Sequence, residues 1–245
     1  MEEKKTAVVN QLQKEILRLQ GFKTTLGADS TPVDLGVINH AFPNGIFPIG
    51  TIHEFVSTKA EETAATCGFI SGLVSCLMVN DGACLWISKN RTLFPPSLMG
   101  FGVTPDRVIF IDITTDKDLL WVMEEALKCG GLAAVIAEIP QITFTQSRRL
   151  QLAVEQSKVT GFMIRLNARN PGTTACTARW KISPLPSYLE NGMPGVGYPR
   201  WQVELLRVRN GHTGSWKMEW LSQRFSVVAD TIQVPFTGNQ QLNVG

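Results

Sequence analysis

Apolar residues recur along this chain in two patterns, and together they predict alternating strands and helices. From residue 50 to residue 166, short continuous apolar runs alternate with segments whose apolar residues lie three or four positions apart. Continuous runs of this length are typical of strands buried on both faces, and the wider spacing is typical of amphipathic helices. The alternation predicts an α/β fold with a mostly parallel sheet flanked by helices. The predicted strands are Gly50–Val56, Gly82–Ser88, Arg107–Ile113, Leu132–Ile139 and Gly161–Leu166.

Helices are predicted between these strands, and capping residues mark where two of them begin. The first helix is expected over Glu61–Asn80. Thr115 is the predicted N-cap of a later helix, because its hydroxyl can accept a hydrogen bond from a backbone N–H of the first turn. Thr143 with Gln146 three positions later predicts a capping box for a helix that runs to Ser157.

After Thr173 the pattern changes to alternating apolar and polar residues, which predicts antiparallel strands that extend the sheet. These strands are expected at Thr177–Ile182, Trp201–Val208 and Ser215–Trp220. Tryptophans concentrate here, and we expect them in the core, with a partner-facing aromatic patch as the alternative. They are Trp180, Trp201, Trp216 and Trp220.

The two ends of the chain are expected to lie outside the central fold. Lys4–Leu19 is a predicted amphipathic helix whose apolar stripe consists of Val8, Leu12, Ile16 and Leu19. Residues 1–34 are therefore assigned to an N-terminal helix and linker, and residues 35–228 to one α/β domain. Residues 229–245 are expected to form a flexible tail.

Composition narrows the class of protein further. The chain has 245 residues, a formal net charge of +2 and 18% charged residues, so composition does not mark it as a nucleic-acid binder. No secretory signal and no membrane span are predicted, because the charged N-terminus has no apolar segment and Thr63–Val79 is short and contains hydroxyl residues. The five cysteines are widely spaced, so we expect free thiols in a reducing cytoplasm and no metal site.

The segment Glu54–Ala65 lies where a phosphate-binding loop would join the first strand to the first helix. Such a loop reads Gly-x-x-x-x-Gly-Lys-Ser/Thr, with glycines that wrap backbone N–H groups around phosphates, a lysine for their charge and a hydroxyl for magnesium. Glu61 and Glu62 would repel a polyphosphate, by about 1–4 kcal/mol each at 4 Å. These carboxylates would also favour the N-terminus of the helix. In register, the four positions of the pattern are occupied by Ser57, Glu62, Thr63 and Ala64.

Several segments in this order resemble the ImuA proteins, RecA-related accessory factors of bacterial SOS mutagenesis, in the form with a degenerate phosphate loop. The resemblance covers roughly Leu35 to Val227. The segments that carry it are Gly45–Phe55, Leu85–Ile87, Phe101–Val108, Trp121 with Glu124–Leu127, Ser147–Ala153 and Glu204–Gly211.

The resemblance implies a RecA-like core and a non-enzymatic role in DNA synthesis across damage, without a cofactor. The implied partners are an ImuB-like inactive Y-family polymerase and an error-prone DNA polymerase III alpha-type subunit, with RecA as a further candidate. In the RecA pattern, the glutamate that activates water falls near Asn90, and the acidic residue that ends the magnesium-coordinating (Walker B) strand falls at Glu138. Without the loop lysine, Glu138 would have no metal–nucleotide complex to serve. It would then be a strand-end carboxylate satisfied by nearby donors.

Arginines supply the candidate patch for DNA or a partner. Arg148 and Arg149 fall at the start of one predicted helix, and Arg207 and Arg209 share one face of a predicted strand. If they converge, they would form an anion-binding patch, and the alternative is scattered, solvated or ion-paired arginines.

Three other functions stay open at this stage. A cell-division inhibitor of the SulA type is also RecA-like, lacks nucleotide chemistry and binds FtsZ, but it is shorter than this chain. A residual ATPase would need a non-standard phosphate cradle, and a DNA-binding protein would need the arginine patch. A homo-oligomer is compatible with the N-terminal helix, and the three histidines show no spacing typical of a catalytic triad.

Overall fold

A computed structural model of the chain describes residues 33–78, 82–189 and 195–228. The predicted N-terminal helix Lys4–Leu19 and the tail 229–245 lie outside these residues. Among the helices that the structure describes, none is long and apolar enough to cross a membrane.

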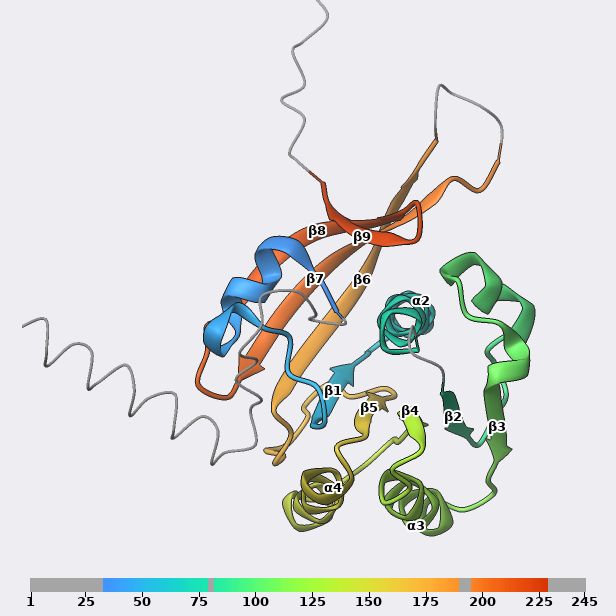
Figure 1. Cartoon of the computed structure of the whole chain (residues 1–245), viewed down its shortest axis with the longest axis vertical. Coiled ribbons are helices and arrows are strands. Elements are labelled where there is room, and N and C mark those ends of the chain that lie inside the picture. Colours follow the sequence, from blue (N-terminus) through green and yellow to red (C-terminus); the bar gives the residue numbers. More distant parts are fainter. Residues whose placement is uncertain (1–32, 79–81, 190–194, 229–245) are drawn as a thin grey trace, which may run out of the picture.

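A single mixed sheet organises the described residues (Figure 1). Its strand order is β3-β2-β4-β5-β1-β6-β7-β8-β9; neighbours from β3 to β6 pair in parallel, and those from β6 to β9 pair antiparallel. The predicted parallel sheet with antiparallel C-terminal strands is therefore confirmed. The strands are β1 (Ile52–Val56), β2 (Ala83–Ser88), β3 (Val108–Asp112), β4 (Leu132–Glu138), β5 (Thr160–Arg165), β6 (Ala178–Tyr188), β7 (Tyr198–Val208), β8 (Gly214–Leu221) and β9 (Arg224–Val227).

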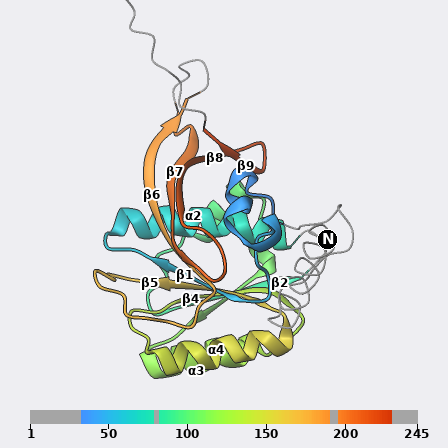
Figure 2. The ribbon, with the colours of Figure 1, turned by 90° about the vertical axis from the view of Figure 1, so that its left-hand side faces the viewer.

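Helices cover both faces of the parallel strands. Helix α2 (Ala60–Leu77) lies on one face, and α3 (Asp116–Leu127) and α4 (Phe144–Ser157) lie on the other, as Figure 2 shows. Both predicted caps are present: Asp118 N donates to Thr115 Oγ1, and Thr143 forms a reciprocal capping box with Gln146. The polar groups at these two helix starts are thus satisfied locally, as the sequence signals indicate.

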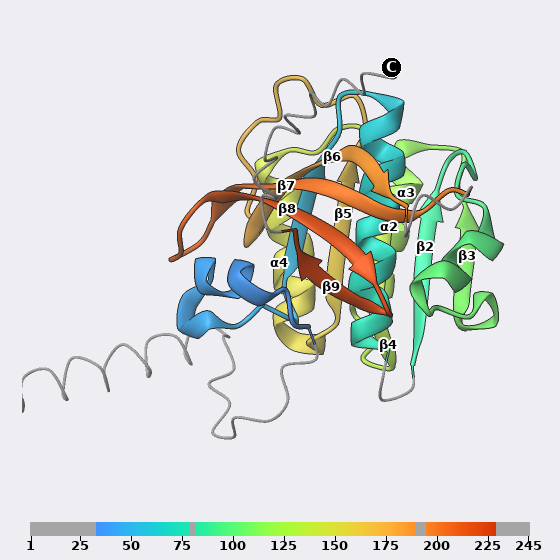
Figure 3. The ribbon, with the colours of Figure 1, turned by 90° about the horizontal axis from the view of Figure 1, so that it is seen from above.

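Two apolar cores hold the layers together. On the α2 side, the long strands β6, β7 and β8 curve around the helix, and they bury Trp180, Trp201 and Trp220 against it (Figures 2 and 3). Trp216 is partly buried against the same core. The second core joins α3 and α4 to the sheet through residues such as Met123 and Val154. The C-terminal tryptophans are thus used mainly for packing.

Two parts of the fold differ from the sequence-based expectation. The stretch before β1 contains two 3₁₀ helices, Gly36–Ala41 and Pro43–Gly45, that the sequence patterns did not predict. This stretch packs into the α2-side core with Leu35, Ile38, Phe42 and Phe47, each at most 4% exposed. Strand β9 was not predicted, because its four residues are too few to show a pattern.

Candidate functional site

A short loop joins β1 to α2 at the position where a phosphate-binding loop would lie. Strand β1 ends at Val56, Lys59 is the N-cap residue, and α2 begins at Ala60. The predicted strand–loop–helix is therefore present. Ser57, which stands at the first glycine position, is fully buried, and its N–H donates to the carbonyl of Arg165 at 3.0 Å. That N–H is already used within the sheet.

Glu62 occupies the anion-binding position of the loop with its own carboxylate. Its Oε2 accepts the backbone N–H of Thr58 at 2.7 Å and the Thr58 hydroxyl at 2.8 Å. Lys181 Nζ lies 3.5 Å from Oε1. Burial alone would raise the pKa of Glu62, but these hydrogen bonds and the Lys181 charge lower it. The carboxylate is thus held in its ionised form where a phosphate would need an N–H donor.

The other predicted loop residues offer no group for a phosphate. Glu61 and Ala64 are exposed on α2, and both line a cavity beside the helix. Thr63, at the lysine position, donates its hydroxyl to the carbonyl of Lys59 at 3.2 Å. The structure therefore brings Glu61, Glu62, Thr63 and Ala64 together on the first turns of α2, and of these four only Glu62 accepts a hydrogen bond from a loop N–H.

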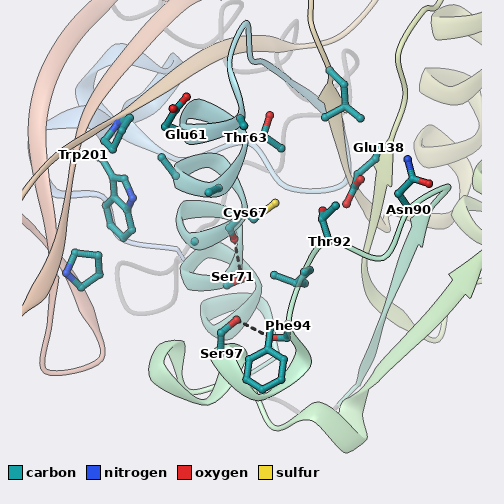
Figure 4. Close-up of a pocket in the computed structure, with 18 of the residues that line it drawn as sticks. Glu61, Thr63, Cys67, Ser71, Asn90, Thr92, Phe94, Ser97, Glu138 and Trp201 are labelled. Atoms are coloured by element: carbon teal, nitrogen blue, oxygen red, sulfur yellow. Dashed lines mark hydrogen bonds between the residues drawn. The ribbon is translucent and has the colours of Figure 1, made fainter. Parts of the chain in front are cut away.

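The cavity lies along α2 and has a volume of about 1050 Å³. Figure 4 shows α2 with Glu61, Thr63, Cys67 and Ser71 between Trp201 on one side and Glu138, Asn90 and Thr92 on the other. Most of its walls are apolar, and they come from segments far apart in the sequence. The apolar wall residues include Leu93, Phe94, Phe101, Leu166, Leu185 and Trp201.

Glu138 is the acidic residue at the end of β4, and it faces this cavity from a buried position. It is 4% exposed, and its Oε1 accepts the indole N–H of Trp86 at 3.0 Å. Burial raises the pKa of Glu138, although the hydrogen bond from Trp86 acts in the opposite direction. The predicted strand-end carboxylate is thus satisfied in part by an indole donor. Asn90, exposed after β2, lines the same cavity.

Three of the four arginines of the predicted patch converge, and one does not. Arg148, Arg207 and Arg209 line a second cavity of about 360 Å³ between the start of α4 and the end of β7. Arg207 donates to the carbonyls of Thr174 and Cys176, and Arg209 donates to that of Ala175, so both also fix the segment before β6. Arg149 is not among the residues that line this cavity, and it forms an ion pair with Glu124 of α3 at 2.7 Å. Arg149 therefore lies apart from the other three arginines, because one helical step turns it toward α3.

A buried ion-pair network was missed by the sequence reasoning. Glu54, fully buried in β1, accepts from Arg165 of β5 at 2.9 Å, from Arg179 of β6 at 2.8 Å and from the Thr174 hydroxyl at 2.7 Å. The sequence signal for this network is the charge of Glu54 inside a mostly apolar predicted strand. A carboxylate buried there needs a partner, and that partner could have been sought. In the part of the chain that the structure describes, no group of three or more His, Cys, Asp or Glu is placed to hold a metal ion.

Comparison with solved structures gives the class of fold. The crystal structure of the RadB recombinase matches with a TM-score of 0.51 and 15% sequence identity, and the match covers 76% of this chain and 94% of that one. At this identity the likeness concerns the fold alone. Together with the site, it defines a RecA-like protein whose phosphate-loop positions carry Ser57, Glu62, Thr63 and Ala64.

Comparison with curated proteins then gives the family. Protein ImuA from two strains of Caulobacter vibrioides is 35% identical over an alignment of 196 residues, and the match covers 74% of this chain and 80% of each relative. The chain belongs to the ImuA family. The cell division inhibitor SulA of Photorhabdus laumondii is 27% identical over 81 residues, which cover 33% of this chain and 46% of SulA. No protein-family model matches the sequence.

Proposed function

We propose that this chain is a non-enzymatic, RecA-fold accessory protein of SOS-induced error-prone DNA synthesis. Family membership supports this role, since the ImuA relatives match most of the chain at 35% identity. The proposed partners are an ImuB-like inactive Y-family polymerase and an error-prone DNA polymerase III alpha-type subunit, which the chain would hold together as a scaffold in the cytoplasm. RecA is a further candidate partner.

The observation that carries the non-enzymatic part of the proposal is the position of Glu62. A catalytic phosphate loop must present free N–H groups and a lysine to the nucleotide. Here the Thr58 N–H is bonded to the Glu62 carboxylate, and Thr63 stands at the lysine position. A polyphosphate would have to displace a carboxylate that hydrogen bonds and Lys181 already stabilise.

The chain is expected not to bind ATP, even at millimolar concentration with magnesium. Isothermal calorimetry of the full chain with ATP and MgCl₂ should show only the heat of dilution, and Glu138→Gln should leave that result unchanged. A saturable heat signal in the wild-type chain that Glu138→Gln removes would show that a non-standard nucleotide site exists, and the non-enzymatic assignment would then fail.

The scaffold role predicts a stable complex with the ImuB-like protein. Co-expression of the full chain with a tagged ImuB-like protein should yield both proteins after affinity purification and gel filtration. The N-terminal segment Lys4–Leu19 and the tail 229–245 are the proposed docking segments. If a chain without both segments is retained equally well, this docking assignment is wrong, and if the full chain is not retained, the scaffold role itself is wrong.

Division inhibition of the SulA type is the second candidate, since a weaker match to SulA exists. It covers only a third of the chain, which favours the ImuA role. Filamentation of cells on overexpression, with FtsZ polymerisation blocked by the purified chain, would favour the SulA role instead.

A further inference from the structure

The cavity beside α2 has the length of a peptide-binding groove. Its lining includes helix residues from Ala60 to Ser71, which span roughly 16 Å of the helix axis at 1.5 Å per residue. Ala64 lines it from α2 with a small, exposed side chain, so a neighbouring chain can approach the first turns of the helix closely. Segment 90–101 and the hairpin of β6 and β7 form its two walls (Figure 4).

The walls of the groove expose apolar surface that water solvates poorly. Phe94 is 68% exposed at one wall, and Leu93, Phe101, Leu185 and Trp201 line the groove with it. Apolar side chains gathered in one concave site are typical of surfaces that bind a partner or ligand. The groove therefore favours an occupant with bulky apolar side chains.

The charges of the groove determine what else the occupant must carry. Its two basic side chains are already paired: Lys89 lies 3.0 Å from Asp116, and Arg200 lies 2.8 Å from Glu219. The carboxylate of Glu138 is in the opposite situation, because only its Oε1 has a hydrogen-bond donor among the residues that the structure describes. Glu138 is 4% exposed and lines the groove, and its Oε2 is not sealed from solvent, so a donor on an occupant can take the place of water at this oxygen.

Glu61 and Cys67 further limit the kind of occupant that the groove can bind. Glu61 adds a second carboxylate at the end of the groove near the start of α2, so an anionic occupant is disfavoured. Cys67 also lines the groove, but burial, followed by the charge of Glu138, raises the pKa of its thiol to about 12. A protonated, buried thiol is a poor nucleophile, so the groove is suited to non-covalent binding.

We propose that this groove binds a short segment of a partner protein in which bulky apolar side chains flank a lysine or arginine, with the cation reaching Glu138. The inference rests on the proposed scaffold role, because it names the site through which the chain would hold a partner. A bound cation would favour the ionised form of Glu138 and so offset the effect of burial on its pKa.

Selection from a random nonapeptide phage library on the full immobilised chain tests this proposal. Peptides that bind the wild type should share apolar residues around a lysine or arginine. Ala64→Trp, which places a large side chain in the groove, should abolish their binding. Both Ala64→Trp and Glu138→Gln must first show a wild-type circular dichroism spectrum and cooperative thermal unfolding.

Fluorescence anisotropy with the best selected peptide then isolates the contact with Glu138. On the wild type, replacing the basic residue of the peptide by norleucine should weaken binding about tenfold, the change expected for one charge-assisted contact. On Glu138→Gln the same replacement should have little effect. Any of three outcomes would overturn the proposal: no selected peptide needs the groove, the selected peptides lack a basic residue, or the norleucine replacement weakens binding equally on the wild type and on Glu138→Gln.

Co-purification separates this proposal from the scaffold role. If the Ala64→Trp chain still retains the ImuB-like protein as the wild type does, the scaffold role stands and the groove is not its docking site. If the wild-type chain retains no partner, the scaffold role fails irrespective of the groove.

Discussion

Replacing Glu54 by leucine is expected to destabilise the fold by about 3–5 kcal/mol, the usual range for removing one partner of a buried ion pair. Glu54 is fully buried and accepts hydrogen bonds from Arg165 and Arg179, whose side chains are 7% and 13% exposed. Leucine would leave two buried guanidinium groups without their carboxylate. Arg165 depends most on Glu54, because its Nη1 donates to that carboxylate and its buried Nε has no hydrogen-bond partner among the described residues. Urea unfolding followed by tryptophan fluorescence at pH 7.5 measures the difference.

Two further variants separate the charge effect from a loss of packing. Lys89→Ala removes an exposed pair with Asp116 and should change the free energy of unfolding by less than about 1 kcal/mol. The triple variant Glu54→Leu, Arg165→Met, Arg179→Met should recover more than half of the loss, because no unpaired charge remains buried. Equal stability of the triple variant and Glu54→Leu would show that unpaired arginines are not the cause.

Local patterns predicted the elements of this fold, but not the order in which they pair. The capping residues Thr115 and Thr143 act within one helical turn, so the sequence alone specifies them. The placing of β1 between β5 and β6 depends instead on long-range packing, which no local pattern records. Likewise, the two 3₁₀ helices before β1 have no repeat long enough to detect, although their apolar residues are buried.

The candidate site was predictable where it is continuous in sequence and not where distant segments meet. The loop from Ser57 to Ala64 is one segment, so the missing glycines and lysine could be recognised directly. The groove joins Phe94, Glu138 and Trp201, which come from three separate parts of the chain. No spacing rule links those residues, so the groove could not be predicted.

His53 is the second residue for which a large effect is expected, because its environment requires a neutral ring. It is fully buried in β1, stacked on Phe47 with ring centroids 4.5 Å apart. Its Nε2 lies 2.7 Å from the carbonyl of Pro48, and its Nδ1 accepts the indole N–H of Trp180 at 3.3 Å. Protonation would put a hydrogen on Nδ1. That hydrogen would face the indole N–H of Trp180, which can only donate. Burial lowers the pKa of His53 from 6.5 to about 4, despite the opposing hydrogen bond to Pro48.

The low pKa of His53 should make the protein lose stability between pH 6.5 and pH 4. In this window the unfolded chain binds a proton that the folded chain excludes, so the contribution of His53 is complete above pH 6.5 and falls as the pH is lowered. The free energy of unfolding is expected to drop by about 2 kcal/mol between pH 7.5 and pH 5, and by about 3 kcal/mol in total. Glu62 acts in a lower range, because its lowered pKa removes stability only below its ordinary value of 4.5.

Urea unfolding at pH 7.5, 6 and 5 measures this loss, and substitutions of the histidines assign it. His53→Gln should lower stability at pH 7.5 but remove most of the change between pH 7.5 and pH 5, since glutamine does not titrate. The double variant His40→Gln, His212→Gln is the matched control, because both side chains are exposed and should leave the pH dependence of the wild type intact. An unchanged slope in His53→Gln would mean that groups other than this buried imidazole cause the acid sensitivity.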